Sequence, residues 1–382
     1  MPAWLDGLLV PAAHRLPSNA EYLAHLSVSA ADANLIRLAS NENTEPPSPR
    51  VRKALERAYL DANLSPPPVP PLRVALAERY GIGRERVLLG AGSTELIEAT
   101  LRAFVRAGDE VVMPRPSWPV FRRRLQALEA RIVEVPLVAG EEAYAFDLDA
   151  LLAAVTAQTK VLIVCTPNNP TGNSLPLDDV RRCAAAGPLL LLDAAYADFD
   201  EEHDVTPIVH ESERVILTRT FSKAYCLAGL RVGYAVGDSR VLDYVDRFLV
   251  PGSSISSAAL HAGLAALEDE KHHRRQVERI RAERTRLTAE LRDRGLRAYD
   301  SGGNFVAVEA TDGARAFADA ILAHGVVVRV MDERLVRITV GRREENDALL
   351  AAVSERVPAP RSAGRSRRSR SRPNLCAPTA SG

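Results

Sequence analysis

Residues 218–234 read Thr-Arg-Thr-Phe-Ser-Lys-Ala-Tyr-Cys-Leu-Ala-Gly-Leu-Arg-Val-Gly-Tyr. The stretch contains one lysine, Lys223, with the hydroxyl residues Thr220 and Ser222 just before it and Arg231 eight positions after it. In a mostly apolar setting, desolvation and a nearby cation lower the pKa of an amine, which makes it a nucleophile toward a carbonyl. Hydroxyl groups and an arginine are donors suited to a phosphate. An amine beside phosphate donors is what pyridoxal 5'-phosphate (PLP) requires; the alternative is a buried lysine paired with an acid.

Residues 222–233 resemble the lysine motif of the fold-type I PLP-dependent aminotransferases of classes I and II, and they are most similar to the histidinol-phosphate aminotransferase branch. This resemblance implies that Lys223 binds the cofactor covalently as an imine and that Arg231 holds the cofactor phosphate. It also implies an α/β fold of the fold-type I PLP-dependent transferase class. Such a fold has a large domain with a mainly parallel sheet of the seven-stranded type, together with a small α+β domain.

The overall composition predicts a globular chain without a charged macromolecular partner. Its 382 residues suffice for a large core and two domains. Lysine plus arginine and aspartate plus glutamate number 49 each, so neither a nucleic acid nor a membrane is expected as a partner. The four cysteines lack the paired spacing of a zinc site or a redox dithiol, which predicts reduced thiols and no metal. Because we find no signal peptide and no run of about 18 apolar residues, we expect a cytoplasmic location.

Short apolar runs alternate with helical patterns along most of the chain. Strands are expected at residues 87–89, 110–113, 161–164, 189–192, 215–217, 304–309, 326–330 and 335–340. Helices are expected at residues 49–60, 72–80, 95–106, 118–129, 241–248, 257–297 and 344–356. In the first two thirds of the chain this alternation predicts a parallel sheet that is covered by helices on both faces.

Three regions are predicted from these patterns. Residues 48–250 are expected to form the large PLP-binding domain, and residues 1–47 and 251–357 the small domain. Residues 358–382 are rich in arginine, serine and proline and contain no acids, so we expect a disordered tail. Such a tail can contact nucleic acid or acidic surfaces, although a solubilising extension is the simpler interpretation.

Two further motifs suit a bound cofactor. Residues 90–94, Gly-Ala-Gly-Ser-Thr, lie between a predicted strand and a predicted helix, where exposed amides can bind an anion. The resemblance implies that the amides of Ser93 and Thr94 bind the PLP phosphate, whereas ordinary helix capping is the alternative. Trp118 follows the next strand, where the family has an aromatic residue stacked on the pyridine ring. An ordinary core tryptophan is the alternative there.

Polar residues also follow two of the buried strands. Residues 166–172 read Thr-Pro-Asn-Asn-Pro-Thr-Gly, and the resemblance assigns Asn169 to the phenolic oxygen of the cofactor. Asp193 ends an all-leucine run, where a buried carboxylate is costly unless it is paired and where open α/β sheets bind ligands. The resemblance assigns Asp193 to the pyridine nitrogen and Tyr196 to the phenolic oxygen. A helix-capping aspartate beside a core tyrosine is the alternative.

Two segments are predicted to contact the substrate. Residues 335–346 resemble the family segment whose arginine binds the substrate carboxylate, and Arg337, flanked by strand hydrophobics, needs an anionic partner. Asn41 begins an Asn-Glu-Asn sequence that matches the segment closing over the substrate. Ser65, however, stands where the histidinol-phosphate branch has a tyrosine that reaches the cofactor phosphate of the partner subunit. A Tyr-x-Pro-Gly motif near the N-terminus is also missing, so the substrate stays open.

By this resemblance the chain is expected to be a homodimeric, PLP-dependent transaminase. It would transfer an amino group between an amino acid, or an amino phosphate, and a 2-oxo acid, so that its partners are a small-molecule amino donor and acceptor. One alternative is a related PLP enzyme that performs decarboxylation, elimination or cyclisation. Another is a PLP-sensing regulator without enzymatic activity.

Overall fold

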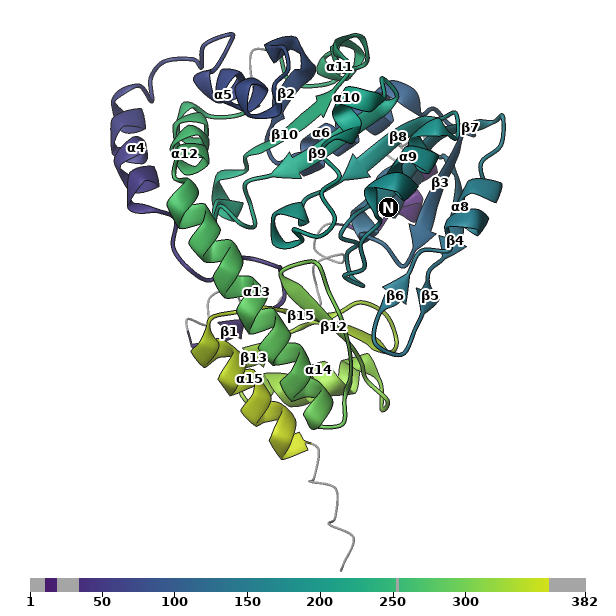
Figure 1. Ribbon diagram of the computed structural model, residues 1–382, viewed down its shortest axis with the longest axis vertical. Helices are drawn as coiled ribbons and strands as arrows, with labels where there is room; N and C mark the ends of the chain where they lie inside the picture. Colours follow the sequence, from purple (N-terminus) through teal and green to yellow (C-terminus); the bar gives the residue numbers. More distant parts are fainter. Residues whose placement is uncertain (1–10, 19–33, 252–253, 357–382) are drawn as a thin grey trace, which may run out of the picture.

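The computed structural model of the chain describes residues 11–18, 34–251 and 254–356. Its upper part in Figure 1 is built on a seven-stranded sheet. In spatial order the strands are β2 (Val87–Gly90), β10 (Gly233–Gly237), β9 (Val215–Thr220), β8 (Leu189–Asp193), β7 (Thr159–Cys165), β3 (Glu110–Arg115) and β4 (Arg131–Pro136). From β9 to β4 all neighbours are parallel, while β10 runs antiparallel to both β2 and β9. The prediction of a mainly parallel, seven-stranded sheet is confirmed.

A hydrophobic core lies on each face of this sheet, because successive residues of a strand point to opposite faces. In β8, the buried side chains of Leu190 and Leu192 belong to one core, and that of Leu191 belongs to the other. The first core includes residues of α4 (Pro49–Leu60), α5 (Pro71–Tyr80), α8 (Leu148–Ala153), α9 (Leu177–Ala185), α10 (Ile208–Glu211) and α12 (Ser257–Glu268). The second includes residues of α6 (Ser93–Phe104), α7 (Pro119–Ala127) and α11 (Ser239–Asp246). Burial on both faces explains why the strands are continuously apolar.

A second, antiparallel sheet of four strands lies in the lower part of Figure 1. Its order is β11 (Arg297–Tyr299), β12 (Phe305–Glu309), β15 (Leu335–Thr339) and β14 (Arg329–Val330), and it is accompanied by α13 (Glu270–Asp293), α14 (Ala314–Leu322) and α15 (Arg343–Arg356). The N-terminal segment joins this part, because β1 (Ile36–Arg37) pairs in parallel with β13 (Val326–Val327). The domain boundaries stay a prediction, and residues 358–382 lie outside the described residues.

Several elements differ from the sequence-based expectation. The helix predicted at residues 257–297 is two helices, because the side chain of Asp269 accepts a hydrogen bond from the main-chain N–H of His272 and caps a new helix there. The strand predicted at 326–330 divides between two sheets as β13 and β14. We did not predict β4, β10, β11, α8, α9, α10, α14 or the hairpin of β5 (Val138–Ala139) and β6 (Tyr144–Ala145). None of the helices in the described ranges is long and apolar enough to cross a membrane.

Candidate active site

The carboxyl ends of the parallel strands meet at one edge of the seven-stranded sheet, which is where open α/β sheets bind ligands. Strand β7 ends at Cys165, β8 at Asp193 and β9 at Thr220. A pocket of about 390 Å³ lies at this edge. Every predicted site residue except Asn41 lines it, namely Ser93, Thr94, Trp118, Asn169, Asp193, Tyr196, Thr220, Ser222, Lys223, Arg231 and Arg337. Residues from widely separated stretches of the sequence, from Ser93 to Arg337, therefore meet in one place.

Lys223 lies in the loop that follows β9. Its Nζ donates a hydrogen bond to the main-chain carbonyl of Ser40 at 3.2 Å and lies 5.9 Å from the centre of the Tyr196 ring. Burial lowers the pKa of Lys223 to about 7, and the charge of Arg337 acts in the same direction. Among the described residues no carboxylate forms an ion pair with this amine, so the alternative of a buried lysine paired with an acid is not supported. A large share of the amine is neutral near pH 7, and the neutral form is the nucleophile.

Asp193 is buried at the end of β8 with 3% of its surface exposed. Its carboxylate accepts a hydrogen bond from Oγ1 of Thr218 on the neighbouring strand, at 3.2 Å. Burial raises the pKa of Asp193 to about 6, while the hydrogen bonds from Thr218 and from the main chain of Ala195 oppose that shift. This carboxyl group is therefore sensitive to a positive charge or a proton donor in the pocket, either of which would stabilise its ionised form.

Tyr196 and Arg337 are joined through one asparagine. The amide nitrogens of Asn169 and Asn41 both donate to the hydroxyl of Tyr196, at 3.1 and 3.0 Å. The amide oxygen of Asn169 accepts a hydrogen bond from Arg337 at 2.7 Å. Burial raises the pKa of Tyr196 to about 12, so its hydroxyl keeps its proton and remains a donor toward the pocket. Asn41 thus belongs to the same network, although it does not line the pocket.

Another group of residues that line the pocket, around Arg231 and the start of α6, suits an anion. Helix α6 begins at Ser93 after Gly92, whose φ of 82° is left-handed, and no side chain caps the helix there. The guanidinium of Arg231 lies so close that a Cβ at Gly92 would come within 2.5 Å of its NH2. Arg231 also donates to Oγ of Ser222 at 3.4 Å, and Ser222 in turn accepts from Oγ1 of Thr220 at 2.8 Å. A helix N-terminus beside an arginine and two hydroxyls is an anion-binding arrangement.

Trp118 lies between the second hydrophobic core and the pocket. Its indole packs edge-on against the buried ring of Phe121, with ring centres 5.3 Å apart and planes at 88°. It also lines the pocket and is only half-buried. A flat, partly exposed ring at this position offers contact area to another ring.

Sequence reasoning did not single out several residues that line the pocket, among them Ser40, Arg329 and Met331. Arg329 on β14 stands opposite Arg337 on β15, so an antiparallel pairing of these two stretches would have placed it on the same face. Ser40 contributes a main-chain carbonyl, which no residue-type pattern can reveal.

A larger hollow of about 710 Å³ is lined in part by Tyr225, which belongs to the loop that follows β9 and carries Lys223. Its wall includes Asp198, which forms ion pairs with Arg219 at 2.9 Å and with His273 at 3.1 Å, and the His273 ring stacks on Tyr225. Asp198, Arg219 and His273 are thus paired with one another, and no lysine of the described ranges lines this hollow. We therefore place the reaction in the smaller pocket, although the other cavity is larger.

The family model described as aminotransferase class I and II matches residues 33–353. The chain belongs to this family. Class I and II aminotransferases are PLP-dependent transaminases, so the expected family, cofactor and class of reaction are confirmed. The pocket fits that cofactor, because an amine, a buried carboxyl group and an anion-binding end line it together.

Comparison with individual relatives shows which members of this family the chain resembles. The chain is 38% identical over 325 residues to histidinol-phosphate aminotransferase 2 of Caulobacter vibrioides, covering 83% of this chain and 85% of the relative. It is 34% identical to an aromatic amino acid aminotransferase of Cutibacterium acnes, covering 85% and 93%. The crystal structure of histidinol-phosphate aminotransferase from Sinorhizobium meliloti with PLP superposes with a TM-score of 0.79, at 30% identity, covering 91% and 97%. The fold-type I architecture is therefore confirmed.

Proposed function

We propose that this aminotransferase uses PLP bonded to Lys223 to move an amino group between an amino acid, or an amino phosphate, and a 2-oxo acid. The observation that supports this best is the meeting of Lys223, Asp193 and Arg231 around one pocket. An amine of lowered pKa suits the cofactor aldehyde, a buried carboxyl group suits its ring nitrogen, and an arginine beside a helix N-terminus suits its phosphate. When bound, PLP supplies a sink for the electrons of the substrate's α-carbon–hydrogen bond.

Two sets of residues would hold the cofactor. The phosphate would be bound by the guanidinium of Arg231, the hydroxyls of Thr220 and Ser222, and the first amides of α6 at Ser93 and Thr94. The ring would be held by Asp193 at its nitrogen, by Asn169 and Tyr196 at its phenolic oxygen, and by the face of Trp118. This division is supported by two distinct hydrogen-bond networks, one that joins Asn169 to Tyr196 and one that joins Thr220, Ser222 and Arg231.

Lys223 would also move the proton. Its Nζ would remove the proton from the substrate α-carbon as a general base and return a proton as a general acid. A pKa of about 7 suits both directions, because a general acid–base works best when its pKa lies near the working pH. The Ser40 carbonyl, 3.2 Å from Nζ, would keep the amine from rotating away.

At the substrate end, Arg337 would bind the carboxylate or an equivalent anion, and Asn41 would close over it. Arg329 lines the same pocket as a second cation. Trp118 and Met331 provide a ring face and an apolar side chain there. The relatives named above act on histidinol phosphate and on aromatic amino acids. An amino substrate with both a ring and an anionic group is therefore the class we propose.

We also propose a homodimer in the cytoplasm, with each site at the dimer interface. Exposed apolar side chains at the end of α4 and just after it support an interface there; Tyr59, Leu60 and Leu64 are 80%, 75% and 60% exposed. Apolar patches of this kind on a protein surface mark interaction sites. The described cysteines, which are Cys165, Cys183 and Cys226, are free thiols, in keeping with a reducing compartment.

A half-reaction with the PLP-loaded protein tests the proposal. Histidinol phosphate, glutamate and aromatic amino acids would each be mixed with the enzyme, and conversion to the pyridoxamine form would be followed by absorbance. We expect conversion with at least one of them, together with an equal amount of carbonyl product. The Lys223→Ala variant serves as the control and is expected to lose both the covalent cofactor link and the conversion.

Other products would point to the alternative chemistry. Release of carbon dioxide or ammonia without the pyridoxamine form would show that this chain performs decarboxylation or elimination. A Lys223→Ala variant that retained the visible absorbance of the lysine-bound cofactor would contradict the assignment of the nucleophile.

A further inference from the structure

Residues 39–43, which we call the strap, contribute Ala39, Ser40 and Glu42 to the lining of the pocket. The main-chain carbonyl of Ala39 accepts a hydrogen bond from Arg337 at 2.6 Å, and that of Ser40 accepts one from Nζ of Lys223 at 3.2 Å. The proposed nucleophile and the proposed anion-binding arginine are thus both oriented by consecutive main-chain groups of the strap. A small displacement of the strap would move both side chains.

The middle of the strap is held by Asn41. Its main-chain N–H donates to Oγ1 of Thr339 at 2.9 Å, and its carbonyl accepts from Asn304 at 3.0 Å. Its side-chain amide reaches the hydroxyl of Tyr196. Asn41 has a φ of 52°, a left-handed conformation that asparagine tolerates better than most residues. The first three residues of the strap are therefore bonded to the second sheet and to the pocket.

The far end of the strap depends on α13. The side-chain oxygen of Asn43 accepts a hydrogen bond from NH2 of Arg279 at 2.9 Å, and its amide nitrogen donates to Gln276 at 3.4 Å. Burial raises the pKa of the Cys226 thiol to about 12, and the charge of Arg279 and a hydrogen bond from Asn43 act against that shift. Cys226 is three residues from Lys223, so this end of the strap also lies beside the lysine loop.

Arg279 holds a second segment as well. Its NH1 donates to the carbonyl oxygen of Gly341 at 3.1 Å, in the turn that follows β15. In the described part of the chain, its hydrogen-bond partners are all uncharged oxygen atoms. Burial lowers the pKa of Arg279, and the negative charges of Glu45, Glu345 and Glu283 act against that shift. One guanidinium therefore joins the strap to the strand that carries Arg337.

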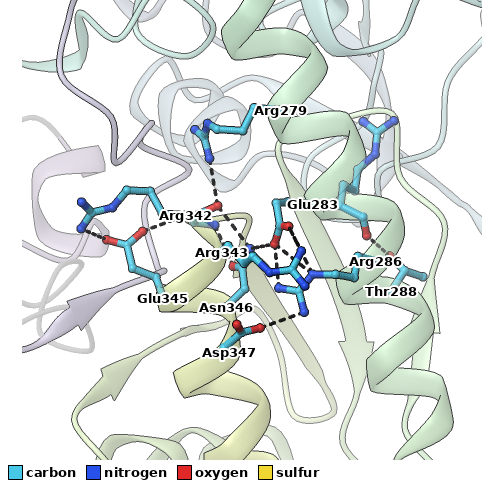
Figure 2. Close-up of polar contacts among 11 residues, drawn as sticks. Arg279, Glu283, Arg286, Thr288, Arg342, Arg343, Glu345, Asn346 and Asp347 are labelled. Carbon is cyan, nitrogen blue, oxygen red and sulfur yellow. Dashed lines mark hydrogen bonds and ion pairs between the residues drawn. The ribbon is translucent and has the colours of Figure 1, made fainter.

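The turn at Gly341 is itself firmly held. Asn346, which is fully buried, accepts from the N–H of Gly341 at 2.9 Å and donates to its carbonyl at 3.2 Å. Asn346 also donates to Glu283 of α13 at 3.0 Å, and Glu283 pairs with Arg286 at 2.7 Å. Figure 2 shows Arg279 at the upper edge of this cluster between α13 and α15. The Gly341 turn, to which Arg279 donates, is therefore fixed by hydrogen bonds that involve both α15 and α13.

We propose that Arg279 is a positioning residue for the amino-transfer reaction: it fixes the end of the strap at Asn43 and thereby orients the Ser40 and Ala39 carbonyls toward Lys223 and Arg337. The inference rests on the proposed function of the pocket. It predicts an effect on Lys223 and Arg337 rather than on the binding of the cofactor phosphate, because the proposed phosphate contacts come from α6, Thr220, Ser222 and Arg231 and not from the strap.

The test compares Arg279→Ala with Arg286→Ala, a substitution of the same kind two turns further along α13. Arg286 pairs with Glu283 and Asp347 and makes no contact with the strap among the described residues. For R279A we expect kcat/KM toward the amino donor to fall about tenfold, with a lower kcat from the displaced Lys223 and a higher KM from the displaced Arg337, while the Kd for PLP is unchanged. Hydrogen exchange of the amides of residues 39–43, measured by mass spectrometry, should accelerate in R279A and stay slow in R286A. Arg279→Lys can reach only one of the two acceptors and should fall between wild type and R279A.

The outcomes separate this inference from the proposed function. If R279A exchanged its strap amides at the wild-type rate, or lost PLP affinity in parallel with KM, Arg279 would have no specific positioning role. If R279A did not fold, Asn43→Ala would break the same contact from the strap side and should give the same change in exchange and KM. If the wild-type protein transferred no amino group, the proposed function would fail, and the exchange comparison would still decide whether Arg279 holds the strap.

Discussion

The main-chain carbonyl of Ser40 accepts a hydrogen bond from Nζ of Lys223 at 3.2 Å, across 183 positions of sequence. The lysine loop belongs to the seven-stranded sheet, whereas Ser40 follows β1, which pairs with the C-terminal part of the chain. The contact therefore joins the two parts of the molecule at the proposed reacting amine. A substrate that displaced this amine from its cofactor would leave it next to a carbonyl acceptor already in place.

The lowered pKa of Lys223 predicts how attachment of PLP depends on pH. The neutral amine attacks the aldehyde, so the rate of covalent attachment to the cofactor-free protein should rise with pH up to about 7 and then level off. A lysine peptide in solution is the control, and its rate should keep rising to about pH 10. Stopped-flow absorbance measures both rates. A rate for the protein that continued to rise as in the peptide would mean that the amine is not desolvated.

Replacement of Asp193 by asparagine keeps the shape of the side chain and removes its charge. Because this carboxylate is proposed to hold a proton on the cofactor ring, we expect kcat to fall on the order of a hundredfold or more. Thr218→Val removes one hydrogen bond to Asp193 and should cost much less, with a further rise in the pKa of Asp193. Steady-state kinetics over a range of pH would compare the two variants. A wild-type kcat in Asp193→Asn would contradict the proposed role.

Two glycines on either side of Arg231 should differ in their tolerance of alanine. A Cβ at Gly233 would lie 2.3 Å from the main-chain nitrogen of Ser93 and 2.4 Å from the carbonyl carbon of Gly92, and main-chain atoms cannot move aside cheaply. A Cβ at Gly229 would meet no atom within 4 Å. We expect Gly233→Ala to lower the free energy of unfolding by about 1–3 kcal/mol, and Gly229→Ala to leave it nearly unchanged. Urea unfolding of the cofactor-free proteins measures this difference, and equal stabilities would show that the α6 loop can shift.

The proposed dimer can be tested at the exposed apolar residues at the end of α4 and just after it. Charges introduced by Tyr59→Asp together with Leu64→Asp would be buried without partners in an interface, so we expect the double variant to be monomeric and to lose most activity. Val138→Asp is the control, because Val138 is also an exposed apolar residue, at 52%, but lies in the β5–β6 hairpin. Light scattering coupled to size-exclusion chromatography measures the mass. A double variant that stayed dimeric would place the interface elsewhere.

Much of the candidate site was predictable because its parts are local. The glycine-rich turn before α6, the asparagine before Pro-Thr-Gly and the aspartate at the end of β8 all occupy recognisable positions next to apolar strands. The prediction missed Ser40, Arg329 and Arg279 for three different reasons. Ser40 acts through its main chain, Arg329 depends on the pairing of β14 with β15, and Arg279 looks like one of many charges on a solvated helix.

The order of residue types along the chain determined the strands, the helix starts and the chemical groups offered to a cofactor, since each of these depends on side chains a few positions apart. Tertiary structure alone decided that the strap contacts Lys223 and Arg337, that β10 runs antiparallel between β2 and β9, and that Arg279 bonds to Asn43. Apart from the pairing of β10 with β9, those contacts join residues more than a hundred positions apart. Their free energy comes from burying both partners together, and no pattern within either segment records which distant partner it will meet.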